Sequence, residues 1–254
     1  MKFQRKISRL CGTAAAAALL ACVVHAQSAK EIVRISDNNL RGSSSYAEVT
    51  MTIVKPDWTR EMTLKMWQKG NDYGLVLVTD PPRDRGTVTL KRGNEVWNWV
   101  PSIERVIKIP PSMMMQSWLG SDFTNDDLVK QSSIVDDYTH TLTGDTVVDG
   151  HACYVITMIP RENAPVVWGK IVSSITKEHY LQLRSEMYDE DGFLSKILTS
   201  RNIQTVGDRT LTVHWEMVPA DKPDQKTVMD YGEWRFELPI DDSFFSIQNL
   251  RRVR

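Results

Sequence analysis

Two periodicities divide the chain into one helix and a long series of strands. Apolar residues recur three and four positions apart between Ser28 and Leu40, which predicts an amphipathic helix that ends at Arg41-Gly42. From Ala47 onward apolar and polar residues alternate, and a period of two predicts strands with one buried face. The strands expected from this pattern are 47–53, 62–66, 73–79, 86–90, 95–100, 105–109, 134–143, 152–159, 166–176, 181–188, 193–203, 210–218 and 226–236.

Turn signals separate these strands at short intervals, as at Lys69-Gly70-Asn71-Asp72 and Arg92-Gly93-Asn94, which favours antiparallel neighbours. A large antiparallel sheet curls or closes, and its inner face must be covered. We therefore predict a mainly β (α+β) fold, a curved antiparallel sheet that forms an open half-barrel. The N-terminal helix and short central helices would act as its plug or lid, and an apolar hollow beneath a lid is a typical ligand site.

Residues 110–130 interrupt the alternation and have the most unusual composition in the chain. Pro110-Pro111 ends a strand, 112–118 is predicted as a short helix, and 124–127 reads as a capping box for a second helix that continues to Lys130. Methionine side chains are flexible and suit ligands of variable shape. The tract is either a plug, with its residues in the core, or a lid that covers a ligand. Both interpretations place it at the same position over the sheet.

A hollow that takes up a hydrocarbon ligand must offer it a comparable apolar surface. Each buried methylene contributes about 0.8 kcal/mol, so one long acyl chain gains roughly 10 kcal/mol by leaving water. Trp97 and Trp99 share one face of a strand and form a pair, although ordinary core packing would also account for each residue singly. The candidate ligand-binding residues are Met62, Met66, Trp67, Trp97, Trp99, Met113, Met114, Trp118, Leu119 and Phe123.

Residues 1–26 have the organisation of a secretory signal peptide: a basic start, an apolar run over 10–24 and small or tolerated residues before Ala26. The apolar run is too short for the ~20 residues of a membrane-spanning helix. We expect cleavage after Ala26 and a single mature domain over 27–254. The alternative is a lipobox, Leu19-Leu20-Ala21-Cys22, which would make Cys22 an acylated first residue.

Charge and cysteine content change when the signal peptide is removed. The full chain carries 31 basic and 32 acidic residues; residues 1–26 hold four of the basic ones, so 27 against 32 remain. A net negative chain is a poor binder of nucleic acid phosphates. Cys153 is then the one cysteine left, so no intramolecular disulfide can form. Export without disulfides points to a soluble protein of the bacterial periplasm.

No enzyme signature is present in the sequence. It has no Gly-x-Ser-x-Gly elbow, no His-Glu-x-x-His and no glycine-rich phosphate loop. Asp122, Asp126 and Asp127 could suggest a metal cluster, but a capped helix start explains them more simply. We therefore predict no catalytic residue, no metal and no cofactor.

The central tract also carries a family resemblance. The run 112–128, with Gln116-Ser117-Trp118-Leu119-Gly120-Ser121-Asp122-Phe123, resembles the signature of the bacterial outer-membrane lipoprotein-sorting family, relatives of the LolA carrier. Segments 41–44, 167–170 and 245–250 are similar to that family as well. The resemblance implies a LolA/LolB-like half-barrel with a helical lid that binds lipid or acyl chains in the periplasm.

Three functions follow from these expectations. The first is a monomeric carrier or chaperone for the acyl chains of lipoproteins or other lipids. It would be loaded by an inner-membrane transporter and would deliver to an outer-membrane acceptor. The second is a lipid-sensing module that regulates or assists a membrane transporter, and the third is an unrecognised hydrolase.

Overall fold

The computed structural model describes residues 27–130 and 133–253. The predicted signal peptide, cleavage after Ala26 and acylation of Cys22 lie outside these ranges. The helices are α1 (Ala29–Arg41) and α2 (Asn125–Lys130), with short 3-10 turns η1 (Pro101–Ile103), η2 (Pro111–Met113), η3 (Ser133–Val135), η4 (Asp242–Phe245) and η5 (Asn249–Arg251). The strands are β1 (Ser44–Lys55), β2 (Trp58–Lys69), β3 (Tyr73–Asp80), β4 (Val88–Arg92), β5 (Glu95–Val100), β6 (Arg105–Ile109), β7 (Tyr138–Val148), β8 (His151–Pro160), β9 (Lys170–Thr176), β10 (Gln182–Tyr188), β11 (Leu194–Val206), β12 (Arg209–Pro219) and β13 (Lys226–Phe236).

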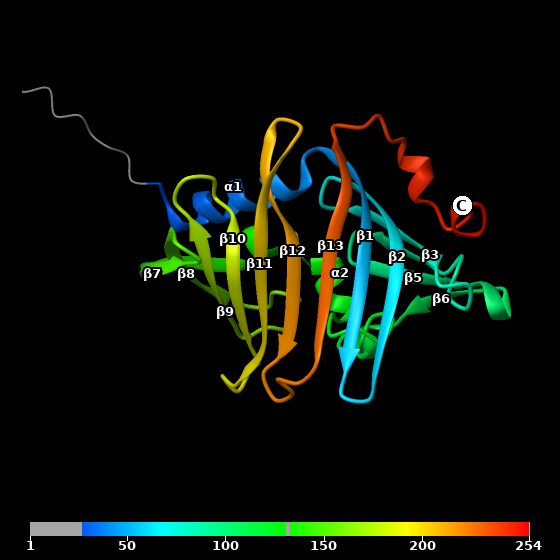
Figure 1. The fold of residues 1–254 in the computed structure, drawn as a ribbon, viewed down its shortest axis with the longest axis horizontal. Coiled ribbons are helices and arrows are strands. Elements are labelled where there is room, and N and C mark those ends of the chain that lie inside the picture. The colour runs from blue at the N-terminus through cyan, green and yellow to red at the C-terminus, as the bar shows by residue number, and fades with distance from the viewer. Residues whose placement is uncertain (1–26, 131–132, 254) are drawn as a thin grey trace, which may run out of the picture.

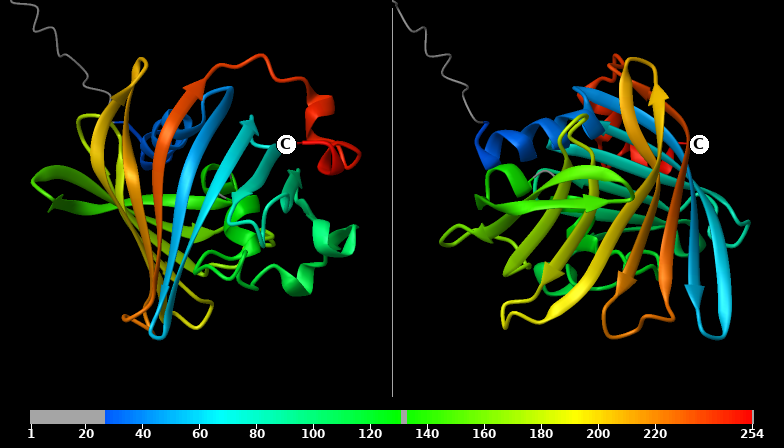
Figure 2. Two further views of the ribbon diagram at one scale, coloured as in Figure 1. Left: turned by 45° about the vertical axis from the view of Figure 1, so that its right-hand side comes forward. Right: turned by 60° about the vertical axis from the view of Figure 1, so that its left-hand side comes forward.

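The thirteen strands form one sheet in the order β6-β5-β4-β3-β2-β1-β13-β12-β11-β10-β9-β8-β7 (Figure 1). Every neighbouring pair is antiparallel. The sheet consists of two meanders, β1 to β6 and β7 to β13, which join where the first strand pairs with the last. It curves without closing (Figure 2), and the predicted open antiparallel half-barrel is confirmed.

This strand order decides where residues 110–137 must run. They connect β6 at one edge of the sheet to β7 at the opposite edge. The described part around Trp118 and Phe123 lies on the inner side of the curve, where these two side chains are buried among side chains of β1, β2 and β13. We call residues 110–137 the crossing segment. The topology therefore places the Met- and Trp-rich tract inside the half-barrel.

The alternation of β1 and β2 explains which face lies inside. Ala47, Val49, Met51 and Ile53 share the inner face of β1 and pack with Met62 and Leu64 of β2. The outer face of β3 to β5 has a cover of its own, because Leu75, Leu77, Val88 and Leu90 pack on Phe245, Leu250 and Val253. The C-terminal segment 237–253 lies over this end of the sheet (Figure 1), so the sheet is buried on both faces there.

Helix α1 covers the half-barrel at the β7 side. Ser28 accepts a hydrogen bond from the backbone N–H of Glu31, as an N-cap residue does. Ile32 and Val33 pack with Met158 and Ile171 of the sheet. Gly42 ends the helix at φ 62°, a conformation that favours glycine, and a Cβ there would lie 2.6 Å from Oε1 of Glu237, whose side chain would have to move. Among the described residues, no helix is both long and apolar enough to cross a membrane.

The predicted helix over 112–118 is wrong. After η2 the backbone forms a small hairpin, in which Ser117 pairs with Thr124 and the N–H of Trp118 donates to the carbonyl of Phe123 at 2.8 Å. Leu119 and Gly120 turn the hairpin with φ of 52° and 79°, as in a type I′ turn. The capping box is confirmed: the N–H of Thr124 donates to Asp127, and the N–H of Asp127 donates to the Thr124 hydroxyl.

Candidate ligand-binding cavity

A cavity of about 200 Å³ lies between α1, the inner face of the sheet and the crossing segment. For comparison, an apolar cavity of about 150 Å³ is enough to bind benzene. Its lining comes from strands of both meanders. The apolar side chains that line it include Leu40, Ala47, Met66, Val76, Phe123, Met158, Val166, Ile171, Met187, Leu198 and Met217.

One wall of the cavity is aromatic. Tyr231 of β13 lies 4.4 Å from Trp234, centroid to centroid, with the two rings nearly parallel. Trp215 of β12 packs on the other side of Tyr231 at 5.3 Å, and all three rings line the cavity. Burial raises the pKa of Tyr231 above its ordinary value, so this phenol stays neutral. The wall offers rigid apolar area at little conformational cost.

A cluster of charged side chains lines the cavity where α1 ends. Nε of Arg41 donates to Oδ1 of Asp37, four residues earlier in α1, at 2.7 Å. Lys91 of β4 joins them in the lining; the residue is 8% exposed, and its Nζ donates to the carbonyl of Asn71 at 2.7 Å. Burial, together with the charge of Arg41, lowers the pKa of Lys91 to about 8. Burial also raises the pKa of Asp37, against the opposing effect of Arg41.

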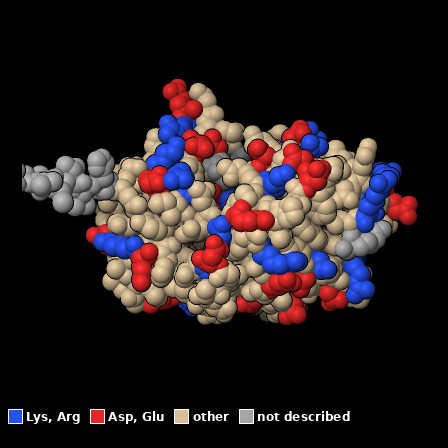
Figure 3. All heavy atoms as spheres, turned by 90° about the horizontal axis from the view of Figure 1, so that it is seen from above, with Lys and Arg blue, Asp and Glu red and all other residues tan. Residues whose placement is uncertain are grey.

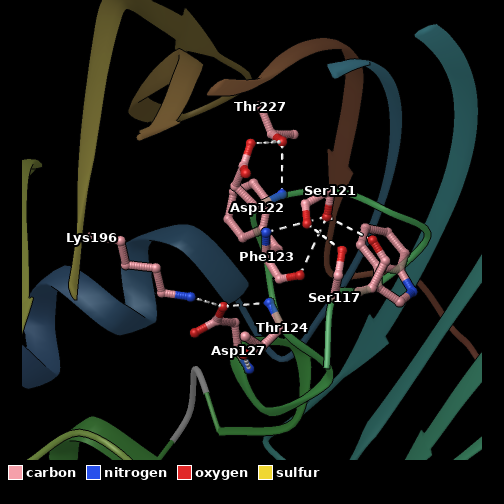
Figure 4. Close-up of polar contacts among 9 residues, drawn as sticks. Ser117, Ser121, Asp122, Phe123, Thr124, Asp127, Lys196 and Thr227 are labelled. Carbon is pink, nitrogen blue, oxygen red and sulfur yellow. Dashed lines mark hydrogen bonds and ion pairs between the residues drawn. The ribbon is translucent and has the colours of Figure 1, made fainter. Parts of the chain in front are cut away.

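The crossing segment is tied to the sheet by buried polar contacts (Figure 4). The N–H of Asp122 donates to the hydroxyl of Thr227 in β13 at 2.9 Å, and that hydroxyl donates to the Asp122 carboxylate at 2.7 Å. Lys55 of β1 forms an ion pair with the same carboxylate. Lys196 of β11 forms a second buried ion pair with Asp127. Asp122 and Asp127 are therefore parts of anchors and of a helix cap, and the described residues contain no cluster of three His, Cys, Asp or Glu that could hold a metal ion.

Comparisons with known proteins agree with this architecture. A family model described as an uncharacterized protein matches residues 70–252. A DUF1329 family protein from Desulfovibrio piger is 25% identical over 86% of this chain and 95% of its own, with a TM-score of 0.78. A putative outer membrane lipoprotein-sorting protein domain from Vibrio parahaemolyticus is 22% identical over 88% and 98%, at 0.79. A LolA superfamily protein from Nitrosomonas europaea is 21% identical over 88% and 100%, at 0.75.

The chain belongs to the family of that model, and its fold is LolA-like. This confirms the resemblance that the central signature suggested. No curated protein matches the chain.

The LolA-like fold brings three of the predicted ligand-binding residues to the cavity: Met66, Trp67 and Phe123. The ring of Trp67 packs against Tyr46 and Phe244, centroid to centroid at 5.2 and 5.4 Å. Met62 and Trp118 are fully buried in the inner core, where Leu119 also packs. Nε1 of Trp118 donates to the hydroxyl of Thr89 at 3.1 Å.

Like Met62, Trp118 and Leu119, the other four predicted residues lie outside the cavity lining. Trp97 and Trp99 pair with Leu90 and Val88 and pack with the C-terminal segment on the outer face of this LolA-like sheet. Met113 and Met114 pack on Val96 and Ile109 near the β6 edge. A role of these residues in binding remains a prediction.

The sequence reasoning missed the charged cluster and the aromatic wall of the LolA-like cavity. Asp37 and Arg41 stand four residues apart on the face of α1 that also carries Val33, and this spacing was a usable signal. No sequence signal marks Lys91, because a polar residue between Leu90 and Arg92 reads as an outward position.

On the surface in Figure 3, acidic and basic side chains are interspersed over the visible face.

Proposed function

We propose that this LolA-like protein is a non-enzymatic carrier that binds the acyl chains of lipids or lipoproteins in its cavity and moves them between the membranes of the cell envelope. The cavity under the crossing segment is the observation that supports this most directly. Its lining is mostly aliphatic, methionine and aromatic, as a site for hydrocarbon must be. The Vibrio parahaemolyticus relative is named as a putative lipoprotein-sorting domain, which agrees with the proposal.

The proposal includes the setting in which such a carrier works. Residues 1–26 would direct export to the periplasm, and the mature chain would act as a monomer. An inner-membrane transporter would load it, and an outer-membrane acceptor would receive the cargo. No cofactor, metal or nucleic acid takes part.

Native mass spectrometry of the protein purified from the periplasm tests the proposal. We expect an adduct whose mass is that of a lipid or of a lipoprotein acyl group, and its loss after delipidation. Transfer of a fluorescent phospholipid between two vesicle populations then measures turnover. Protein that binds lipid but does not speed transfer would be a sensor, and protein that binds no lipid would overturn the proposal in either form.

A further inference from the structure

Two cations and one carboxylate of the charged cluster line the cavity at the end of α1. Arg41 and Lys91 lie there with Asp37, which Arg41 engages at 2.7 Å. Asp72 also acts on Lys91, from the exposed turn between β2 and β3, where water screens its charge. A guanidinium and an ammonium therefore both line a cavity whose other walls are mostly apolar.

The lining holds two further acidic residues. Asp126 and Asp127 come from the crossing segment and act on the phenol of Tyr138, whose pKa is raised first by burial and further by these carboxylates. Asp127 is also paired with Lys196. Two cationic groups of the lining thus come from α1 and β4, and apolar and aromatic side chains make up most of the rest.

The sheet makes room for the lysine of this cluster. Gly74 of β3 pairs with Lys91 of β4, and a Cβ at position 74 would lie 3.6 Å from Cβ and 3.9 Å from Cδ of Lys91. The aliphatic stem of the lysine therefore lies across the glycine on the inner face. A lysine at a strand position that points to solvent would need no such space.

We infer that the ligand of this cavity is an amphiphile with an anionic headgroup, a phosphate or a carboxylate, and that Arg41 and Lys91 bind this headgroup while its tail lies along the apolar walls. The inference rests on the proposed function and adds the class of cargo. Charge-assisted hydrogen bonds from a guanidinium and an ammonium suit anionic oxygens, and they strengthen where water is excluded. A neutral headgroup would gain nothing from the charge of the two cations.

Lys91→Met is the variant that isolates the headgroup interaction. It removes the second cation and keeps the Asp37–Arg41 pair intact, so the charges of that pair still balance and the fold should persist. Lys65→Met is the matched control. Lys65 is a half-buried lysine of the neighbouring strand β2, flanked by the inner-face residues Leu64 and Met66 and so on the opposite face.

Isothermal titration of delipidated protein with dodecyl phosphate, dodecanoate, dodecanol and inorganic phosphate tests the inference. We expect at least one of the two anionic amphiphiles to bind about tenfold more tightly than dodecanol. Lys91→Met should remove this preference and leave dodecanol binding unchanged, and Lys65→Met should behave as wild type. Whether the phosphate or the carboxylate binds better identifies the headgroup.

The other outcomes contradict the inference in distinguishable ways. Equal binding of all three amphiphiles to wild type would overturn the headgroup site and leave the carrier proposal standing. Inorganic phosphate that binds as tightly as dodecyl phosphate would show a site for a free anion instead. If neither dodecanol nor the anionic amphiphiles bind, both the inference and the carrier proposal fail. An anionic preference that persists in Lys91→Met would exclude the cluster as its source.

Discussion

Lys196 of β11 and Asp127 of the crossing segment form an ion pair in which the two side chains are only 5% and 8% exposed. The same carboxylate accepts the N–H of Thr124 at 2.7 Å, and the Lys196 ammonium lies 4.6 Å from the centre of the Trp168 ring. One contact thus joins the sheet, the crossing segment and the wall of the cavity.

Removing one partner of this ion pair should destabilise the protein strongly. Lys196→Met leaves the Asp127 carboxylate buried without its cation, and breaking a buried pair in this way costs about 3–5 kcal/mol. Adding Asp127→Asn removes the unpaired charge and should recover most of the loss. Urea unfolding of the two single variants and the double variant measures the coupling between the residues.

A solvent-exposed pair supplies the control for this cycle. Lys30 of α1 pairs with Asp136 of the crossing segment at 2.9 Å, with side chains 44% and 73% exposed. Lys30→Met should cost less than about 1 kcal/mol. Equal losses in Lys30→Met and Lys196→Met would contradict the anchoring role of the buried pair.

The turn of the small hairpin supports a second prediction. Gly120 has φ of 79°, and a Cβ there would lie 3.1 Å from Nη2 of Arg60, which donates to the carbonyl of Leu119. Gly120→Ala should therefore destabilise the protein by about 1–2 kcal/mol. Gly144→Ala in β7 is the control, since an added Cβ there would meet nothing within 4 Å and its φ is not positive. This control should change the thermal midpoint little, and an equal drop in both variants would contradict the role of the turn.

The sequence predicts the strands better than it predicts the crossing segment. Met62 and Leu64 share the inner face of β2, and the sequence predicts this because every second side chain of a strand points to the same face. The hairpin of Ser117 and Thr124 depends on contacts with β1, β11 and β13, which no local pattern contains.

Which face of β5 lies inside could not be predicted either. Trp97 and Trp99 do share one face, as expected, but that face is covered by a C-terminal segment distant in sequence. The alternation of a single strand indicates that one face is buried and leaves open what covers it. Lys91 is the opposite case, because it is a charged residue on the inner face. Only the folded structure shows that it lies in the same cavity lining as the Asp37–Arg41 pair.

Lys91 should give the stability of the protein a distinctive pH dependence. Its pKa is about 8 in the folded protein, because of burial and of Arg41, and returns to about 10.5 on unfolding. Between these values the unfolded chain holds the extra proton, so the free energy of unfolding rises with pH. Relative to Lys91→Met, wild type should gain about 2 kcal/mol between roughly pH 7 and 9.5.

Urea unfolding of both proteins across this pH range measures that difference. Tyr46, whose pKa is raised to about 12, acts in the opposite direction above roughly pH 10, but it is common to both proteins and cancels. Two parallel stability curves would contradict a titrating Lys91. The same loss of charge should weaken the binding of dodecyl phosphate to wild type as the pH rises through about 8.

Filling the cavity should abolish lipid uptake without unfolding the protein. Ala47 lies on the inner face of β1, lines the cavity and pairs with Met66 and Trp234. Ala47→Phe places a ring in the space that the tail would occupy. Because about 200 Å³ is open there, we expect an overpacking cost no larger than the usual ~1–3 kcal/mol.

The outer face of the same strand supplies the matched control for the cavity variant. Thr50→Phe adds the same ring three residues along β1 without entering the cavity, because an odd spacing in a strand changes the face. Native mass spectrometry should then find lipid on wild type and Thr50→Phe but none on Ala47→Phe, with near-ultraviolet circular dichroism reporting intact packing in all three. Lipid that still copurifies with folded Ala47→Phe would mean that the acyl chain binds elsewhere on the sheet.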